Sequence, residues 1–149
     1  MSNITYVVYG SQNGMQIPTR VQVRYSREYC KENNLDFGLS KDEMFYDLDF
    51  SLFKKIINGN TKKIIIFSDI LIANSKVEEY LGELIESNNE DSLKMIEFHL
   101  TFSNEIINAK ELLDRIERIK IHSKFAMSIN DLLDYLKKKR NKPDYINYG

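Results

Sequence analysis

The run Ile-Ile-Ile-Phe at positions 64–67 constrains the fold more than any other feature of this sequence. A strand with one solvated face alternates apolar and polar residues, whereas this run offers no polar side to water. Bounded by Lys63 and Ser68, it is typical of a strand that is covered on both faces. The sequence therefore predicts a central strand of a parallel sheet with helices on either side.

Strands and helices alternate along the rest of the chain. Pro18 suits the first turn of a helix, because its missing N–H has no helical partner there, and Val21, Tyr25 and Tyr29 continue at helical spacing. We expect strands at 4–9, 35–39, 63–68 and 93–100, and helices at 18–33, 49–59, 75–85, 104–121 and 128–142. This alternation predicts parallel strands joined by right-handed crossovers.

The predicted fold class is α/β, as a single domain of three layers. A mainly parallel four-stranded sheet has helices on both faces, and two further helices follow it. We expect residues 1–124 to form the α/β domain and 125–149 to form a C-terminal helix and a loose tail. The 149 residues, 42% hydrophobic and 29% charged, have the makeup of an ordinary globular domain.

Charge and cysteine content exclude several classes of function. Lys plus Arg (21) nearly balances Asp plus Glu (22), so the net charge of -1 gives no overall attraction to nucleic acid or an anionic membrane. Cys30 has no partner for an internal disulfide, and no stretch approaches the ~18 apolar residues of a membrane span. We expect a cytoplasmic protein with no metal site and no cofactor, because one cysteine and two histidines give no zinc spacing.

Ligands of parallel sheets bind where loops leave the carboxyl ends of the strands. The loop 10–17 is the most suggestive, because Ser11 and Asn13 join a strand to a helix whose N-terminus favours anions, with Arg20 nearby. The loop matches neither GxGxxG nor GxxxxGK[ST]. An ordinary glycine-containing turn is the alternative interpretation.

Other candidates lie along the first helix and after the second and third strands. Arg24 continues the basic face of the helix that Arg20 begins, although a solvated face explains it equally well. Asp69 follows the central strand and is the best-placed single carboxylate. The candidate catalytic residues are Ser11, Glu43 and Asp69, and the candidate ligand-binding residues are Asn13, Arg20, Arg24, Ser40 and Ser68.

The segment from Gly10 to about Thr101 resembles the sporadic carbohydrate cluster proteins, a bacterial family encoded among genes for surface-polysaccharide synthesis. The resemblance covers roughly two thirds of the chain. It rests on Ser11 and on the stretches 18–22, 27–30, 39–43 and 65–68. Thr101 stands where the family tends to have an acidic residue. The resemblance implies a glycan-biosynthesis context, with nucleotide sugars or glycan precursors as candidate ligands.

More distantly, the layout is similar to the catalytic domain of serine recombinases, so we describe the expected fold as resolvase-like. Ser11 would take the place of the nucleophile and Asp69 that of an acidic site residue. That chemistry needs several guanidinium groups around the scissile phosphate. The matching positions hold Val8 or Tyr9, Ile70 and Ala73 instead, so we expect no cleavage or joining of DNA.

These observations lead to one expected function and one alternative. The first is an accessory or modifying protein of bacterial cell-surface carbohydrate biosynthesis, which binds a phosphorylated or nucleotide-linked sugar at the carboxyl ends of the strands. The alternative is a non-catalytic dimeric module with a recombinase-like fold. It would pair through the helix 104–121 and contact nucleic acid with residues 137–142. The sequence does not reveal a reaction type.

Overall fold

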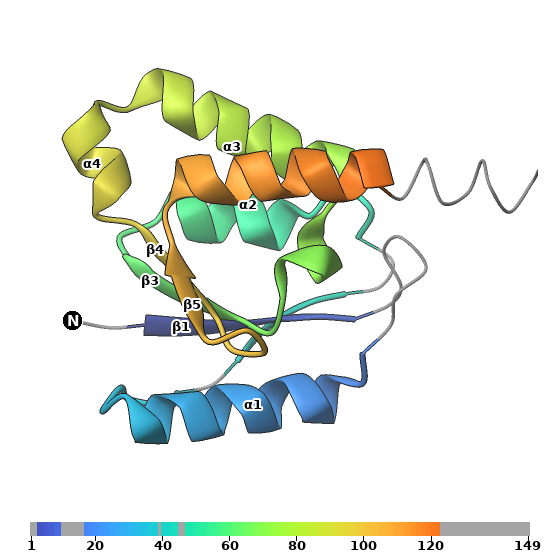
Figure 1. Ribbon diagram of the computed structural model, residues 1–149, viewed down its shortest axis with the longest axis vertical. Helices are drawn as coiled ribbons and strands as arrows, with labels where there is room; N and C mark the ends of the chain where they lie inside the picture. Colours follow the sequence, from blue (N-terminus) through green and yellow to red (C-terminus); the bar gives the residue numbers. More distant parts are fainter. Residues whose placement is uncertain (1–2, 10–16, 39, 45–46, 123–149) are drawn as a thin grey trace, which may run out of the picture.

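The computed structural model describes residues 3–9, 17–38, 40–44 and 47–122. The elements are β1 (Asn3–Val8), α1 (Thr19–Glu32), β2 (Lys41–Glu43), α2 (Ser51–Ile57), β3 (Lys63–Ile66), the short 3-10 helix η1 (Asp69–Ile72), α3 (Ser75–Ser87), α4 (Glu90–Lys94), β4 (Glu97–Leu100), β5 (Glu105–Ile107) and a last helix at residues 109–122. Helix α1 covers one face of the sheet, and α2, α3 and helix 109–122 cover the other (Figure 1). The expected α/β class, three layers and helices on both faces are confirmed.

One sheet of five strands runs in the order β2-β1-β3-β4-β5. The first four strands are parallel, and β5 pairs antiparallel with β4. The chain leaves β1 for one edge of the sheet, returns to β3 and continues toward the other edge. This reversal beside β1 and β3 is the point at which ligands of open parallel sheets bind.

The strand pleat divides the core between the two faces. Even-numbered strand residues such as Tyr6, Ile64 and Phe98 pack with α2, α3 and helix 109–122 in one large apolar cluster. Ile65 points the other way and packs with Tyr29 and Cys30 of α1. The predicted central strand is confirmed, because β3 lies between β1 and β4 and its three isoleucines are fully buried.

Helix α1 is tied to the carboxyl end of β1 by Gln22, a polar residue only 1% exposed. Its amide oxygen accepts from the Val8 N–H at 3.1 Å, and its Nε2 donates to the carbonyls of Val8 and Ile17, both at 2.9 Å. These bonds hold the start of α1 against the edge of the sheet where β1 ends. The chain therefore enters α1 at a fixed place beside the carboxyl ends of the strands.

The predicted second strand at 35–39 is wrong. Leu35 and Phe37 instead pack as partly buried side chains against the Ile65 cluster, and the chain pairs with β1 only from Lys41 onward. Asp36 is tied by its carbonyl, which accepts from the Asn3 side chain at 2.7 Å. Packing beneath the sheet holds this segment in place of a strand ladder.

Two elements predicted in the later part of the chain are present, but their predicted starting residues are wrong. The segment expected to be one strand at 93–100 contains the end of α4 as well as β4, and the expected helix 104–121 begins with β5. Asn104 has a φ of 57° and turns the chain back, so the sheet has five strands and not four. The helical stripe starts at Ala109. It is fully buried against the protein's own sheet at Leu112 and Ile116, so dimerisation through this helix stays a prediction.

Helix α2 begins at a different residue from the one expected, and the acceptor for its first N–H groups comes from another element, β2. Its N-cap is Phe50, in a left-handed conformation, and not Asp49. The N–H groups of Leu52 and Phe53 donate to the carboxylate of Glu43 at 3.3 and 2.9 Å. An acceptor from β2 therefore satisfies the free donors at the start of this helix.

No helix in the described part of the chain is long and apolar enough to cross a membrane. The structure describes the predicted α/β domain as far as residue 122. The predicted helix 128–142 and the predicted domain division at residue 124 lie outside the described residues.

Replacing Ile65 with Asp tests the central position of β3. An unpaired charge in a fully buried site costs several kcal/mol of a total stability of roughly 5–15 kcal/mol, so we expect Ile65→Asp to abolish soluble expression. Ile106→Asp is the matched control, because Ile106 in β5 is 57% exposed. A folded Ile65→Asp protein, judged by circular dichroism and thermal melting, would contradict this architecture.

Candidate ligand-binding site

Ser68 and Asp69 stand where β3 ends, at the reversal of the sheet. Ser68 caps η1 by accepting from the Ile70 N–H at 3.3 Å, and its hydroxyl donates to Asp69 Oδ1 at 3.2 Å. Because β3 is fixed on both faces, the position of this pair is fixed by the core. Asp69 keeps 18% of its side chain exposed, which leaves its carboxylate open to a ligand.

Arg115 of helix 109–122 connects Asp69 to the β5 strand. Its Nη1 lies 3.7 Å from Asp69 Oδ2 and donates to Glu105 Oε1 at 3.1 Å, while Nη2 donates to Glu105 Oε2. The hydrogen bonds from Arg115 lower the pKa of Glu105 to about 2, with a further contribution from the Ser103 side chain. The same pairing with Glu105, and then with Asp69, raises the pKa of Arg115.

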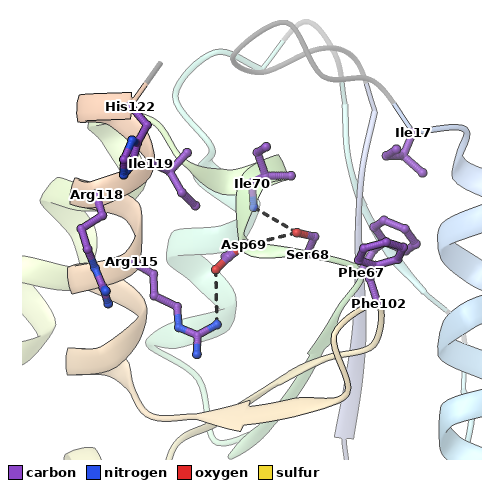
Figure 2. Close-up of a pocket in the computed structure, with 10 residues that line it drawn as sticks. All are labelled: Ile17, Phe67, Ser68, Asp69, Ile70, Phe102, Arg115, Arg118, Ile119 and His122. Carbon is purple, nitrogen blue, oxygen red and sulfur yellow. Dashed lines mark hydrogen bonds and ion pairs between the residues drawn. The ribbon is translucent and has the colours of Figure 1, made fainter. Parts of the chain in front are cut away.

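A cavity of about 730 Å³ opens beside this pair, between the carboxyl end of β3 and helix 109–122 (Figure 2). Its described lining residues are Ile17, Phe67, Ser68, Asp69, Ile70, Phe102, Arg115, Arg118, Ile119 and His122. The lining combines apolar side chains with two guanidinium groups, an imidazole, a hydroxyl and one carboxylate. This mixture and this size are typical of small-molecule sites.

One face of helix 109–122 supplies the cationic side of the cavity. Arg115, Arg118 and His122 are spaced by three and four residues, so they lie on the same face of the helix. Among the residues that the structure describes, Arg118 pairs with Asp114 alone, at 2.9 Å, and both side chains are more than 60% exposed (63% and 66%). An exposed pair of this kind is worth little, so Arg118 can exchange its partner for a ligand anion at small cost.

The opposite side of the cavity is aromatic. The rings of Phe67 and Phe102 lie 5.3 Å apart between centroids and are tilted by 35°. Tyr25 of α1 packs edge-on against Phe67 at 5.0 Å. Phe67 is buried, whereas Phe102 is 64% exposed despite its size, so an apolar ring face borders the cavity.

The structure brings together two of the predicted site residues, Ser68 and Asp69. Glu43 lies elsewhere, is 2% exposed and caps α2, and its Oε1 also accepts from the Tyr6 hydroxyl at 2.6 Å. Burial raises the pKa of Glu43 against the lowering effect of these bonds. Its hydrogen bonds with the described residues Tyr6, Leu52 and Phe53 hold β1, β2 and α2 together, which is a structural role.

Ser40 does not follow a strand, as the sequence analysis assumed. Because β2 starts at Lys41, opposite Tyr6, Ser40 precedes the strand and lies level with the middle of β1. Its hydroxyl donates to Asp42 at 2.8 Å. Ser40 therefore does not lie at the carboxyl ends of the strands. It was expected there because the second strand was predicted at 35–39 and not at 41–43.

The basic face of α1 is exposed at Arg20 and Arg24, and neither residue lines the cavity. Further along, the Arg27 guanidinium lies over the Phe37 ring at 5.2 Å. Ser11, Asn13 and most of the loop 10–17 lie outside the described residues, as do the basic residues 137–142. The anion site expected at that loop stays a prediction.

The sequence did not predict the cationic side of the site, formed by Arg115, Arg118 and His122, or the exposed ring of Phe102. Guanidinium groups were expected close to Asp69 in the sequence, whereas Arg115 reaches Asp69 from a distant helix. A signal was present for the three cationic residues, because they flank the apolar positions Ile116 and Ile119 at helical spacing. Which end of the sheet they would meet depended on β5, which the sequence analysis did not predict.

The other histidine takes part in a buried polar chain under α1. Tyr29 Oη lies 2.6 Å from His99 Nδ1, and His99 Nε2 lies 2.9 Å from Glu97 Oε1. His99 is 3% exposed, and both of its ring nitrogens have partners. These contacts link α1 to β4, which is a structural role.

Within the described ranges no group of three or more His, Cys, Asp or Glu side chains could hold a metal ion. The chain matches no model of a known protein family, and no curated protein sequence matches it.

The pairing of Glu105 with Arg115 predicts a measurable pH dependence. In the folded protein Glu105 should titrate near 2, below its usual range near 4.3, so its small stabilising effect is present above that range and is lost as the pH falls toward 2. In Arg115→Gln the pKa of Glu105, measured by carboxyl NMR titration, should return to its usual range. Arg118→Gln, the control, should leave it unchanged, and an ordinary pKa in the wild-type protein would show that the pair does not form.

Proposed function

We propose that this protein binds a phosphorylated or nucleotide-linked sugar in the cavity beside Asp69, as an accessory or modifying protein of bacterial cell-surface carbohydrate biosynthesis. The observation that carries the proposal is the face formed by Arg115, Arg118 and His122 at the carboxyl end of β3. Guanidinium groups hold phosphate through paired N–H donors. The weakly held Arg118 and the exposed His122 are the groups that meet the anion.

Asp69 and Ser68 support the sugar part of the proposal. A carboxylate repels phosphate but accepts hydrogen bonds from hydroxyl groups, and a serine hydroxyl donates or accepts. Both lie next to the cationic face, so one ligand with a phosphate and several hydroxyls satisfies both kinds of side chain. The glycan context itself comes from the resemblance of 10–101 to the sporadic carbohydrate cluster proteins.

The proposal extends to the setting and to the finer fold assignment. A cytoplasmic location agrees with precursors that are phosphorylated or nucleotide-linked, and a resolvase-like relationship is supported by the mainly parallel sheet with an aspartate at the end of its third strand. The site is proposed as a binding site. Among the described lining residues, Asp69 and the imidazole of His122 could move a proton on a bound sugar.

A binding screen with matched variants tests this function. At about 100 times its dissociation constant, a true ligand among sugar phosphates and nucleotide sugars should stabilise the fold by about 2.7 kcal/mol, read as a rise in melting temperature. Arg118→Gln should weaken that binding about tenfold, because it removes a charged hydrogen bond to the phosphate. Arg27→Gln, on the same protein but away from the cavity, should leave it unchanged.

Two results would reject the proposal. One is the absence of any stabilisation by phosphorylated sugars and nucleotide sugars at millimolar concentration. The other is an equal loss in Arg118→Gln and Arg27→Gln, which would indicate a general charge effect and not a site.

A further inference from the structure

The chemical character of the cavity changes in a fixed order from one side to the other. A series of contacts defines this order: Arg115 lies 3.7 Å from Asp69, Asp69 accepts from Ser68 at 3.2 Å, and Ser68 follows Phe67, whose ring lies 5.3 Å from that of Phe102. Figure 2 shows the same sequence, with Arg118 and His122 on one side, Asp69 and Ser68 in the middle, and the two phenyl rings on the other. The cavity therefore runs from cationic through hydroxyl-binding to aromatic.

A nucleoside phosphate has its groups in the same order. Its phosphate is anionic, its ribose carries vicinal hydroxyls, and its base is a flat aromatic ring. Base rings stack on aromatic side chains, and an acidic side chain is a common acceptor for ribose hydroxyls. A sugar phosphate without a base would leave the exposed face of Phe102 unused.

The hydrogen bonding of Asp69 supports the middle position. An ionised carboxylate has about four acceptor sites. Ser68 occupies one on Oδ1, and Arg115 lies beyond ordinary hydrogen-bond length at 3.7 Å from Oδ2, because Glu105 holds its guanidinium more closely. The acceptor sites of Asp69 that no described residue occupies suit donors from two neighbouring hydroxyls, and a 2′-deoxyribose has lost one of these hydroxyls.

We propose that the cavity binds a ribonucleoside phosphate, with the base on the exposed ring of Phe102, the ribose hydroxyls on Asp69 and the phosphate at Arg118 and His122. This rests on the proposed function and narrows it to ligands with a nucleoside. The sugar of a nucleotide sugar then extends beyond the phosphates. Stacking on Phe102 favours binding of nucleotides over simple sugar phosphates. Hydrogen bonding to Asp69 favours binding of ribose over deoxyribose.

Isothermal titration of the full chain with ribonucleoside 5′-monophosphates of all four bases, their 2′-deoxy forms and ribose 5-phosphate tests the proposal. The preferred ribonucleotide should bind at least about tenfold more tightly than ribose 5-phosphate, the size of one base stacked on an aromatic ring. It should bind about tenfold more tightly than its 2′-deoxy form, the size of one hydrogen bond to a charged group.

Two variants assign these differences to their residues. Phe102→Ala should remove most of the advantage over ribose 5-phosphate and keep the preference for ribose. Asp69→Ala should remove the preference for ribose and keep the base-dependent advantage. Ile106→Ala is the control, because Ile106 is a large exposed apolar residue of β5 that does not line the cavity.

The outcomes separate this inference from the proposed function. Equal binding of ribose 5-phosphate and every nucleotide, lost in Arg118→Gln, overturns the inference and leaves the phosphate site standing. Binding of nucleotides that Phe102→Ala and Ile106→Ala weaken equally also overturns it. If no phosphorylated compound binds, both proposals fail.

Discussion

The complete burial of β3 is the constraint on which the rest of the structure depends. Ile64 and Ile66 contact the helices on one face while Ile65 contacts α1 on the other, so β3 cannot slide by one residue without placing its side chains on the wrong faces. The chain beyond Ile66 therefore leaves the sheet at a fixed point. Ser68 and Asp69 occupy that point, and their position in the cavity follows from the packing of the core.

The sequence predicted the elements whose pattern is local and left out those that depend on distant contacts. The apolar run of β3 and the amphipathic spacing of α1 and α3 were sufficient. The short strands β2 and β5, each of three residues, have no such pattern, because their pairing partners decide them. Glu43 shows the same limit, since its bonds to the start of α2 depend on the position of β2, which the sequence did not predict.

The candidate site divides in the same way. Asp69 was predictable as the carboxylate at the end of a central strand, and Ser68 with it. Arg115, Arg118 and His122 were not, because the missed β5 strand decides which face of helix 109–122 meets the cavity. Three carboxylates of this protein also differ in their roles. Glu43 is buried and hydrogen-bonded internally, and Glu105 forms an ion pair with Arg115. Of the three, Asp69 is the one that lines the cavity.

The most direct test of the central claim is an amide chemical-shift map of the protein during titration with a nucleotide sugar such as UDP-glucose. We expect the largest changes at Ser68, Asp69, Phe102 and Arg118, which come from three separate segments of the chain and line the same cavity. Changes confined to the exposed face of α1, around Arg24 and Arg27, would contradict the central claim, as would a spectrum that no nucleotide sugar alters.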